Sequence, residues 1–129
     1  MPFKACLKAN LIGIEKEGLR VSGDGSIAQT PHPEGLGSAL KNPAITTDFS
    51  EALLELVTQP LKGADQVIDE LTTIHNYIYQ HLPENERFWP ASMPCILRGQ
   101  TNIPIANYGS SNFGMMKTVY RRGLSNRYG

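Results

Sequence analysis

The sequence of 129 residues has little that is typical of secreted, membrane-bound or nucleic-acid-binding proteins. Its two cysteines, Cys6 and Cys95, lie far apart with no CxxC partner, which favours reduced cytosolic thiols over a disulfide framework or a zinc site. Because 12 Lys and Arg balance 12 Asp and Glu, no basic surface for nucleic acid or an anionic membrane is expected. No apolar run approaches the roughly 20 residues of a membrane-spanning helix.

What is present fits one globular domain, with 40% hydrophobic and 19% charged residues. Alternating apolar residues predict β structure over residues 10–30. Over residues 63–82 the spacing of apolar residues changes to that of a helix, which predicts an amphipathic helix that ends at Pro83. The last third, residues 88–129, is rich in proline and glycine, so turns are expected there. Its basic segment, residues 112–124, fits either a solvated turn or an anion site.

The segment of residues 47–58 has two interpretations. Asp48 followed by Glu51 resembles a capping box at the start of a helix, whereas Leu53 to Val57 equally fits a short buried strand. Either structure leaves Glu55 little solvent, and a buried carboxylate must be paired, protonated or metal-bound. A salt bridge and a metal site therefore both remain open for Glu55, and Asp48 on its own fits a helix or turn cap.

Glu15 and Glu17 are spaced so that a strand would place both side chains on one face, roughly 6.5–7 Å apart. Two ionised carboxylates at that distance repel by about 2.4 kcal/mol at an effective dielectric constant near 20. Solvent would weaken this repulsion, and a bound divalent cation would reverse it. A solvated strand face and a cation site are the two interpretations of this pair.

Six ordered segments stand out along the chain: GIEKEGLR at 13–20, HPEGLGSAL at 32–40, ITTDFSEALLE at 45–55, WPASMPC at 89–95, YGSSN at 108–112 and KTVYRRGLSNRYG at 117–129. Together they resemble the proteobacterial-type glutamate–cysteine ligases, the first enzymes of glutathione synthesis. The likeness is in register from Gly13 to the last residue.

The resemblance implies an α+β fold in which an antiparallel sheet forms part of a glutamine-synthetase-like cradle with a flanking amphipathic helix. It implies a cytoplasmic ligase that phosphorylates the γ-carboxylate of glutamate with ATP, after which the cysteine amine attacks the acyl phosphate. Expected partners are these small molecules, with no nucleic acid and no membrane. The expected cofactor is Mg²⁺, with Mn²⁺ as an alternative.

The resemblance also implies roles for individual residues. Arg121 is expected to face the transferred phosphate. Phe49, Tyr120 and Leu124 match positions that line the cysteine pocket. The carboxylates of Glu15, Glu17, Asp48 and Glu55 correspond to the magnesium ligands, which places Glu55 on a strand.

Members of that family are considerably longer than this chain. We therefore expect residues 1–129 to be the N-terminal part of a single catalytic domain, truncated and inactive alone. Two alternatives remain: a non-catalytic remnant that binds metal or ligand, and a related carboxylate–amine ligase with a different amine substrate.

Overall fold

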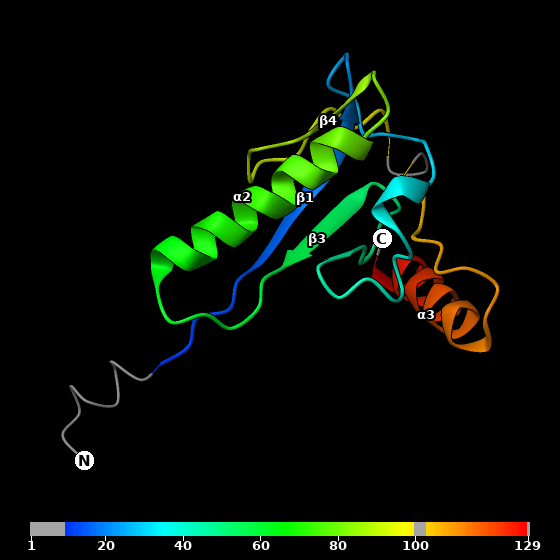
Figure 1. Ribbon diagram of the computed structural model, residues 1–129. Helices are drawn as coiled ribbons and strands as arrows, with labels where there is room; N and C mark the ends of the chain where they lie inside the picture. The colour runs from blue at the N-terminus through cyan, green and yellow to red at the C-terminus, as the bar shows by residue number, and fades with distance from the viewer. Residues whose placement is uncertain (1–9, 100–102, 129) are drawn as a thin grey trace.

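The computed structural model describes residues 10–99 and 103–128 of the chain. Its centre is a four-stranded antiparallel sheet with the strand order β2-β3-β1-β4 (Figure 1). The strands are β1 (Glu15–Ser22), β2 (Ile45–Thr46), β3 (Leu53–Val57) and β4 (Glu86–Phe88). The helices are the short 3₁₀ helix η1 (Glu34–Leu36), α2 (Ala64–His81) and α3 (Asn112–Tyr128).

Strand β3 decides between the two interpretations of residues 47–58. Leu54 and Leu56 are fully buried, whereas Leu53, Glu55 and Val57 are partly exposed on the other face. This alternation has the period of a strand, and β3 pairs with β1 along its whole length. The strand that the family resemblance implied is confirmed.

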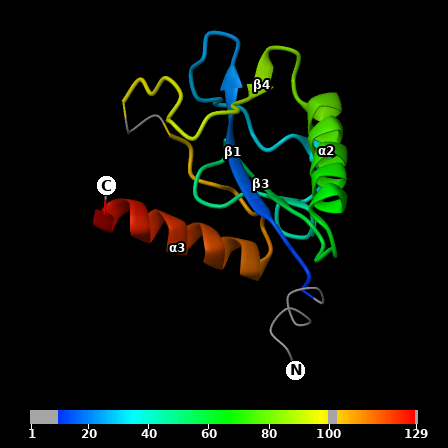
Figure 2. The same ribbon diagram turned by 90° about the vertical axis from the view of Figure 1, so that its left-hand side faces the viewer.

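Helix α2 covers one face of the sheet (Figure 2). It confirms the helix predicted over residues 63–82, and Asp65 stands in its first turn, where the helix dipole favours a negative charge. Its buried residues Val67, Ile74 and Ile78, with the partly buried Leu71 between them, recur every three to four positions. Leu71, Ile74 and Ile78 pack against core residues of β3 and β4. The resulting core contains Leu36, Ile45, Leu54, Leu56, Ile74, Ile78 and Phe88. The α+β class, with an antiparallel sheet and a flanking amphipathic helix, is confirmed.

A buried ion pair fixes the end of the sheet where β1 meets β4. Arg20 Nη1 donates to Glu86 Oε2 at 2.7 Å, and neither side chain is more than 1% exposed. Arg20 Nη2 also donates to the carbonyl oxygens of Thr30 and Glu51, at 2.8 and 3.0 Å. A buried charge needs such partners, because leaving it unpaired is costly.

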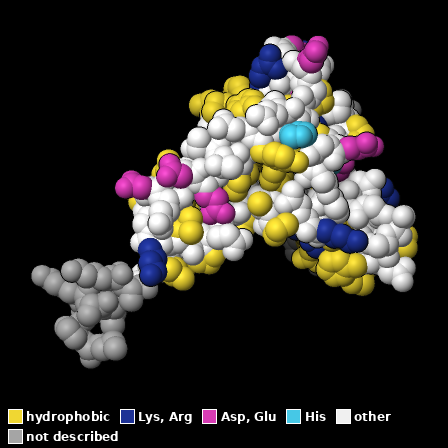
Figure 3. Space-filling model, in the orientation of Figure 1, with side chains coloured by type: hydrophobic (Ala, Val, Ile, Leu, Met, Phe, Trp, Pro, Cys, Tyr) yellow, Lys and Arg dark blue, Asp and Glu magenta, His cyan; other side chains and the backbone are white. Residues whose placement is uncertain are grey.

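The prediction of turns throughout residues 88–129 is wrong for α3, which spans Asn112–Tyr128. Apolar periodicity did not reveal this helix because most of its less exposed residues, among them Gly114, Lys117 and Arg121, are not apolar. Its large apolar side chains are exposed instead: Phe113, Met115, Met116, Val119 and Tyr120. In Figure 3, basic and hydrophobic side chains lie together over this helix. One sequence signal did exist, since Ser111 Oγ accepts the N–H of Gly114 as a helix cap.

Among the described helices, none combines the length and the apolar character needed to cross a lipid bilayer.

Candidate active site

Three glutamate side chains share the face of the sheet that α2 leaves uncovered. Glu15 and Glu17 are two residues apart on β1, and Glu17 is the direct partner of Glu55 on β3. Residues so related project from the same face of a sheet. Lys16 points to the other face, where its ammonium lies 4.5 Å from the centroid of the Phe88 ring. The sheet thus separates an acidic face, defined by the three glutamates, from the apolar face that packs under α2.

The charges on the acidic face act on one another. Burial raises the pKa of Glu55 above its ordinary value, and the carboxylates of Glu15 and Glu17 raise it further. The Lys117 ammonium opposes this effect and lowers the pKa of the same group. Since like charges at opposite sheet positions are destabilising, a cation bound to this face would relieve the repulsion.

Asp48 lies in the loop between β2 and β3, where it forms an ion pair with Arg121 of α3. The Arg121 side chain is 22% exposed and that of Asp48 is 36% exposed, so the pair is partly shielded from water. The family resemblance predicted a metal as the partner of Asp48 and a phosphate as the partner of Arg121. In the structure, each side chain binds the other.

The four predicted metal ligands do not form one closed cluster. Glu15, Glu17 and Glu55 share a face, whereas Asp48 is held by Arg121. Within residues 10–99 and 103–128, no three His, Cys, Asp or Glu side chains lie close enough to hold a metal ion. The donor chemistry itself fits Mg²⁺, which takes carboxylate oxygens and keeps positions for water and phosphate. The metal assignment stays a prediction.

The residues predicted to line a cysteine pocket lie on the two segments that the Asp48–Arg121 ion pair joins. Phe49 follows Asp48 and is half-buried. Tyr120 precedes Arg121 and is 62% exposed, and Leu124, about one turn further along α3, is half-buried. The ion pair brings these segments together, and the assignment of the three side chains to a substrate pocket stays a prediction.

Tyr108 is a site residue to which the sequence assigned no role. Its hydroxyl donates to the carbonyl oxygens of Thr47, at 3.1 Å, and Asp48. Burial, followed by the nearby Glu55 carboxylate, raises the pKa of Tyr108. Its ring lies under the Lys117 ammonium, which is 4.8 Å from the ring centroid. A single aromatic residue in a segment of glycine and serine gives no periodic signal, so its position could not be predicted.

Glu51 is a second residue with an unpredicted role. Its side chain is buried, and its two carboxylate oxygens accept backbone N–H groups from two different loops. The N–H of His32 lies 2.9 Å from Oε1, and the N–H of Asn107 lies 2.6 Å from Oε2. Glu51 therefore ties the loops before η1 and α3 to the β2–β3 loop. The sequence indicated only a helix cap at this position.

Glu15 and Glu17 each border a separate cavity. A cavity of about 420 Å³ is lined by Glu17, Leu53, Trp89 and Met93, among others. Another, of about 370 Å³, is lined by Glu15 together with parts of the chain around residues 13 and 58. The acidic face therefore has open space next to it on the side of each β1 carboxylate.

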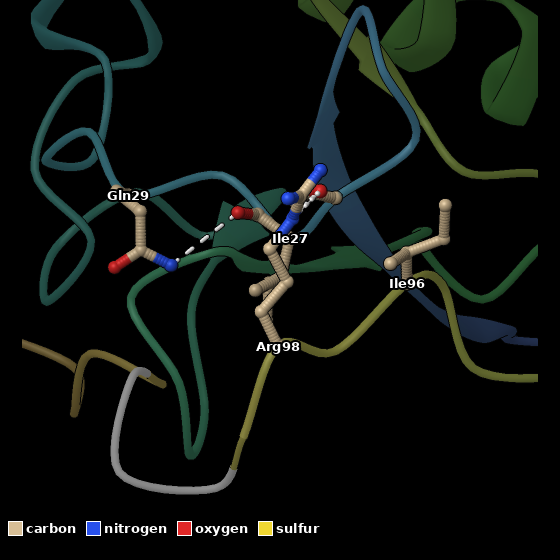
Figure 4. A pocket seen from close by; sticks show the side chains of 5 residues that line it. Ile27, Gln29, Ile96 and Arg98 are labelled. Carbon is tan, nitrogen blue, oxygen red and sulfur yellow. Dashed lines mark hydrogen bonds between the residues drawn. The ribbon is translucent and has the colours of Figure 1, made fainter.

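A smaller pocket, of about 230 Å³, is lined by Ser26, Ile27, Gln29, Ile96 and Arg98 (Figure 4). Gln29 Nε2 donates to the carbonyl oxygen of Ile27 at 3.3 Å, and Arg98 Nε donates to Ser26 Oγ at 3.1 Å. No predicted site residue lines this pocket. The acidic face and the α3 residues opposite it remain the candidate site.

Curated relatives match most of the chain. The chain is 55% identical over 117 residues to the glutamate–cysteine ligase of Alcanivorax borkumensis, covering 91% of the chain and 22% of that protein. It is 56% identical over 123 residues to the glutamate–cysteine ligase of Pseudomonas entomophila, covering 95% of the chain and 23% of that protein. The chain thus spans under a quarter of the length of these relatives.

Solved structures agree. The glutamate–cysteine ligase of Francisella tularensis in complex with AMP superposes with a TM-score of 0.89 at 47% identity, over 93% of this chain and 24% of that one. A bifunctional glutathione synthetase from Pasteurella multocida superposes with a TM-score of 0.79 at 36% identity, over 95% of this chain and 15% of that one. The family profile for glutamate–cysteine ligase matches residues 2–129. The resemblance seen in the six segments is confirmed, and the chain belongs to the glutamate–cysteine ligase family.

Proposed function

We propose that the complete protein carrying this chain joins L-glutamate to L-cysteine with ATP, giving γ-glutamylcysteine in the first step of glutathione synthesis. The observation that carries the proposal is the family match over residues 2–129, with 55–56% identity to relatives named glutamate–cysteine ligase. We further propose that residues 1–129 belong to the N-terminal part of a single catalytic domain. Their alignment with under a quarter of each relative supports this division.

The proposed reaction has two steps. A γ-carboxylate oxygen of glutamate attacks the terminal phosphorus of ATP, which gives γ-glutamyl phosphate and ADP. The cysteine amine then attacks the acyl carbon, so that the C–N bond forms while phosphate leaves and the amine loses a proton. The AMP bound to the Francisella tularensis relative supports a nucleotide site.

Phosphoryl transfer depends mainly on positioning and on neutralising charge. When bound, Mg²⁺, with Mn²⁺ as the alternative, supplies that neutralisation at the phosphates. Glu15, Glu17 and Glu55 would hold it, since their shared face supplies carboxylate oxygens and no Lys, Arg or His of the described residues forms an ion pair with them. Asp48 would serve as a further ligand if its carboxylate left Arg121, whose guanidinium would then be available to the transferred phosphate.

The cysteine pocket is proposed to be formed by the two segments that the Asp48–Arg121 ion pair joins. In this proposal Phe49, Tyr120 and Leu124 line that pocket. Leu124 and Phe49 supply apolar surface for the side chain, and Tyr120 adds an aromatic surface with a hydroxyl. The compartment proposed is the cytoplasm, where ATP is available and where the buried free thiol of Cys95 stays reduced.

The test is ADP release by the purified complete gene product, measured with glutamate alone, cysteine alone, both together, and glutamate with an unrelated amine. The expected result is release that requires both amino acids and magnesium, with γ-glutamylcysteine identified by mass spectrometry. Equal turnover with the unrelated amine would contradict the proposed substrate and favour a related carboxylate–amine ligase. Nucleotide binding without turnover would contradict catalysis and favour a non-catalytic domain.

A further inference from the structure

Lys117 is a cation of α3 that lies close to two aromatic rings. Its ammonium lies 4.8 Å from the ring centroid of Tyr108 and 5.8 Å from that of Phe113, distances at which cation–π attraction acts. The residue is half-buried. These contacts hold the ammonium in one place, unlike that of a lysine extended into solvent.

Lys117 forms no ion pair with any residue that the structure describes. The described part of the chain forms three ion pairs, all through arginine: Arg20–Glu86, Arg98–Asp24 and Arg121–Asp48. No described carboxylate lies within ion-pair distance of the Lys117 ammonium, although its charge favours the ionised form of Glu55. An ammonium has three N–H donors, so contacts with two ring faces leave at least one donor for an anion.

The position of this ammonium is fixed by the same loop that carries Asp48. Tyr108 donates to the carbonyl oxygens of Thr47 and Asp48, which locks its ring beside the β2–β3 loop. Gly114, one turn before Lys117, packs against the backbone at Tyr108 so closely that a Cβ there would overlap the Tyr108 carbonyl oxygen. Helix α3 is therefore seated on the Tyr108 backbone, with Lys117 directed over the ring.

We propose that Lys117 binds a phosphate oxygen of the nucleotide, an inference that rests on the proposed function. The acidic face supplies ligands for a cation on one side of the phosphates. Lys117 supplies positive charge from α3, on the other side, together with Arg121. An ammonium is a point charge with three donors, which suits a phosphate oxygen without demanding one orientation.

The experiment is calorimetric titration of the complete gene product with adenosine, ADP and inorganic phosphate, each with magnesium. Three variants are compared: Lys117→Met, Lys117→Arg, and Lys62→Met as a control at an exposed lysine. Lys117→Met is expected to weaken ADP binding by about 10- to 100-fold, the range that a hydrogen bond to a charged group represents. Lys117→Arg should retain most of the affinity, and Lys62→Met should retain all of it. Adenosine affinity should be the same in all variants.

Native ADP affinity in Lys117→Met would overturn the inference. An equal loss of ADP and adenosine affinity would also overturn it, because that result indicates a structural effect on the whole site. The proposed function fails separately, if the unsubstituted protein forms no γ-glutamylcysteine. If Lys117→Met forms product and binds ADP as the native protein does, the phosphate contact of Lys117 is contradicted and the proposed function is not.

Discussion

Glu17 on β1 and Glu55 on β3 stand directly opposite each other across an antiparallel pair of strands. Opposite positions on a sheet stabilise it when the charges attract and destabilise it when they repel. Burial is the main cause that raises the pKa of Glu55, and the carboxylates of Glu15 and Glu17 raise it further. The sheet therefore carries a repulsion that a proton or a cation can relieve.

Glu55→Gln should stabilise the metal-free protein at neutral pH. A raised folded-state pKa means that the glutamate contributes stability below its ordinary pKa of 4.5, and that this contribution is lost as the pH rises through the folded value. Glutamine cannot ionise, so the melting temperature of Glu55→Gln should exceed that of the native protein once the pH rises above the folded-state pKa of Glu55. The difference should vanish below pH 4.5, the ordinary pKa. Thermal melts in a chelating buffer, taken across this pH range, measure the effect.

The matched control for that experiment is Glu84→Gln, in an exposed loop, which should leave the melting temperature unchanged at every pH. Magnesium should raise the melting temperature of the native protein more than that of Glu55→Gln, because ligand binding to the folded state adds stability. A melting temperature of Glu55→Gln below that of the native protein at neutral pH would contradict the proposed repulsion between Glu55 and the other carboxylates of the acidic face.

Two glycines of α3 should respond in opposite directions to alanine. A Cβ added at Gly123 would meet no other atom within 4 Å, so Gly123→Ala should stabilise the protein by about 0.5–1 kcal/mol through helix propensity. At Gly114 a Cβ would overlap the carbonyl oxygen of Tyr108 and lie 2.9 Å from that of Gly109, so Gly114→Ala should destabilise by about 1–3 kcal/mol. Denaturant unfolding of both variants measures these changes in the free energy of unfolding. Stabilisation by Gly114→Ala would show that α3 is not seated on the Tyr108 backbone.

The ion pair between Asp48 and Arg121 should contribute modestly to stability. Its side chains are partly exposed, and such pairs have coupling energies of about 0.2–1 kcal/mol. A double-mutant cycle with Asp48→Asn and Arg121→Gln, read by the free energy of unfolding, measures that coupling. Strictly additive effects of the two substitutions would mean that the pair does not hold α3 to the β2–β3 loop.

Local pattern predicted part of this structure. The apolar period of residues 63–82 was sufficient for α2, and a spacing of two residues was sufficient to place Glu15 and Glu17 on one face of a strand. The register that sets Glu55 opposite Glu17 joins positions far apart in the sequence, so no local pattern contains it. The strand at Leu53–Val57 was predicted by the family resemblance, since periodicity left a helix equally open.

Helix α3 was missed for a different physical reason. Pattern analysis assumes that a helix buries apolar residues, whereas α3 turns Gly114, Lys117 and Arg121 inward and leaves its large apolar residues exposed. The pairing of Asp48 with Arg121 was equally out of reach, because it joins two residues that the family resemblance assigned to different ligands. The family resemblance therefore assigned roles to single residues, and these roles stay predictions, whereas the ion pair that joins two of them was not predicted.

The most direct test of the central proposal is the magnesium dependence of ADP release by the complete gene product with glutamate and cysteine present. The proposed ligand roles predict that Glu15→Gln and Glu17→Gln require a much higher magnesium concentration for half-maximal release and lose most of the maximal rate, while far-ultraviolet circular dichroism stays native. A half-saturating magnesium concentration equal to that of the unsubstituted protein in both variants would contradict the assignment of the acidic face as the metal site.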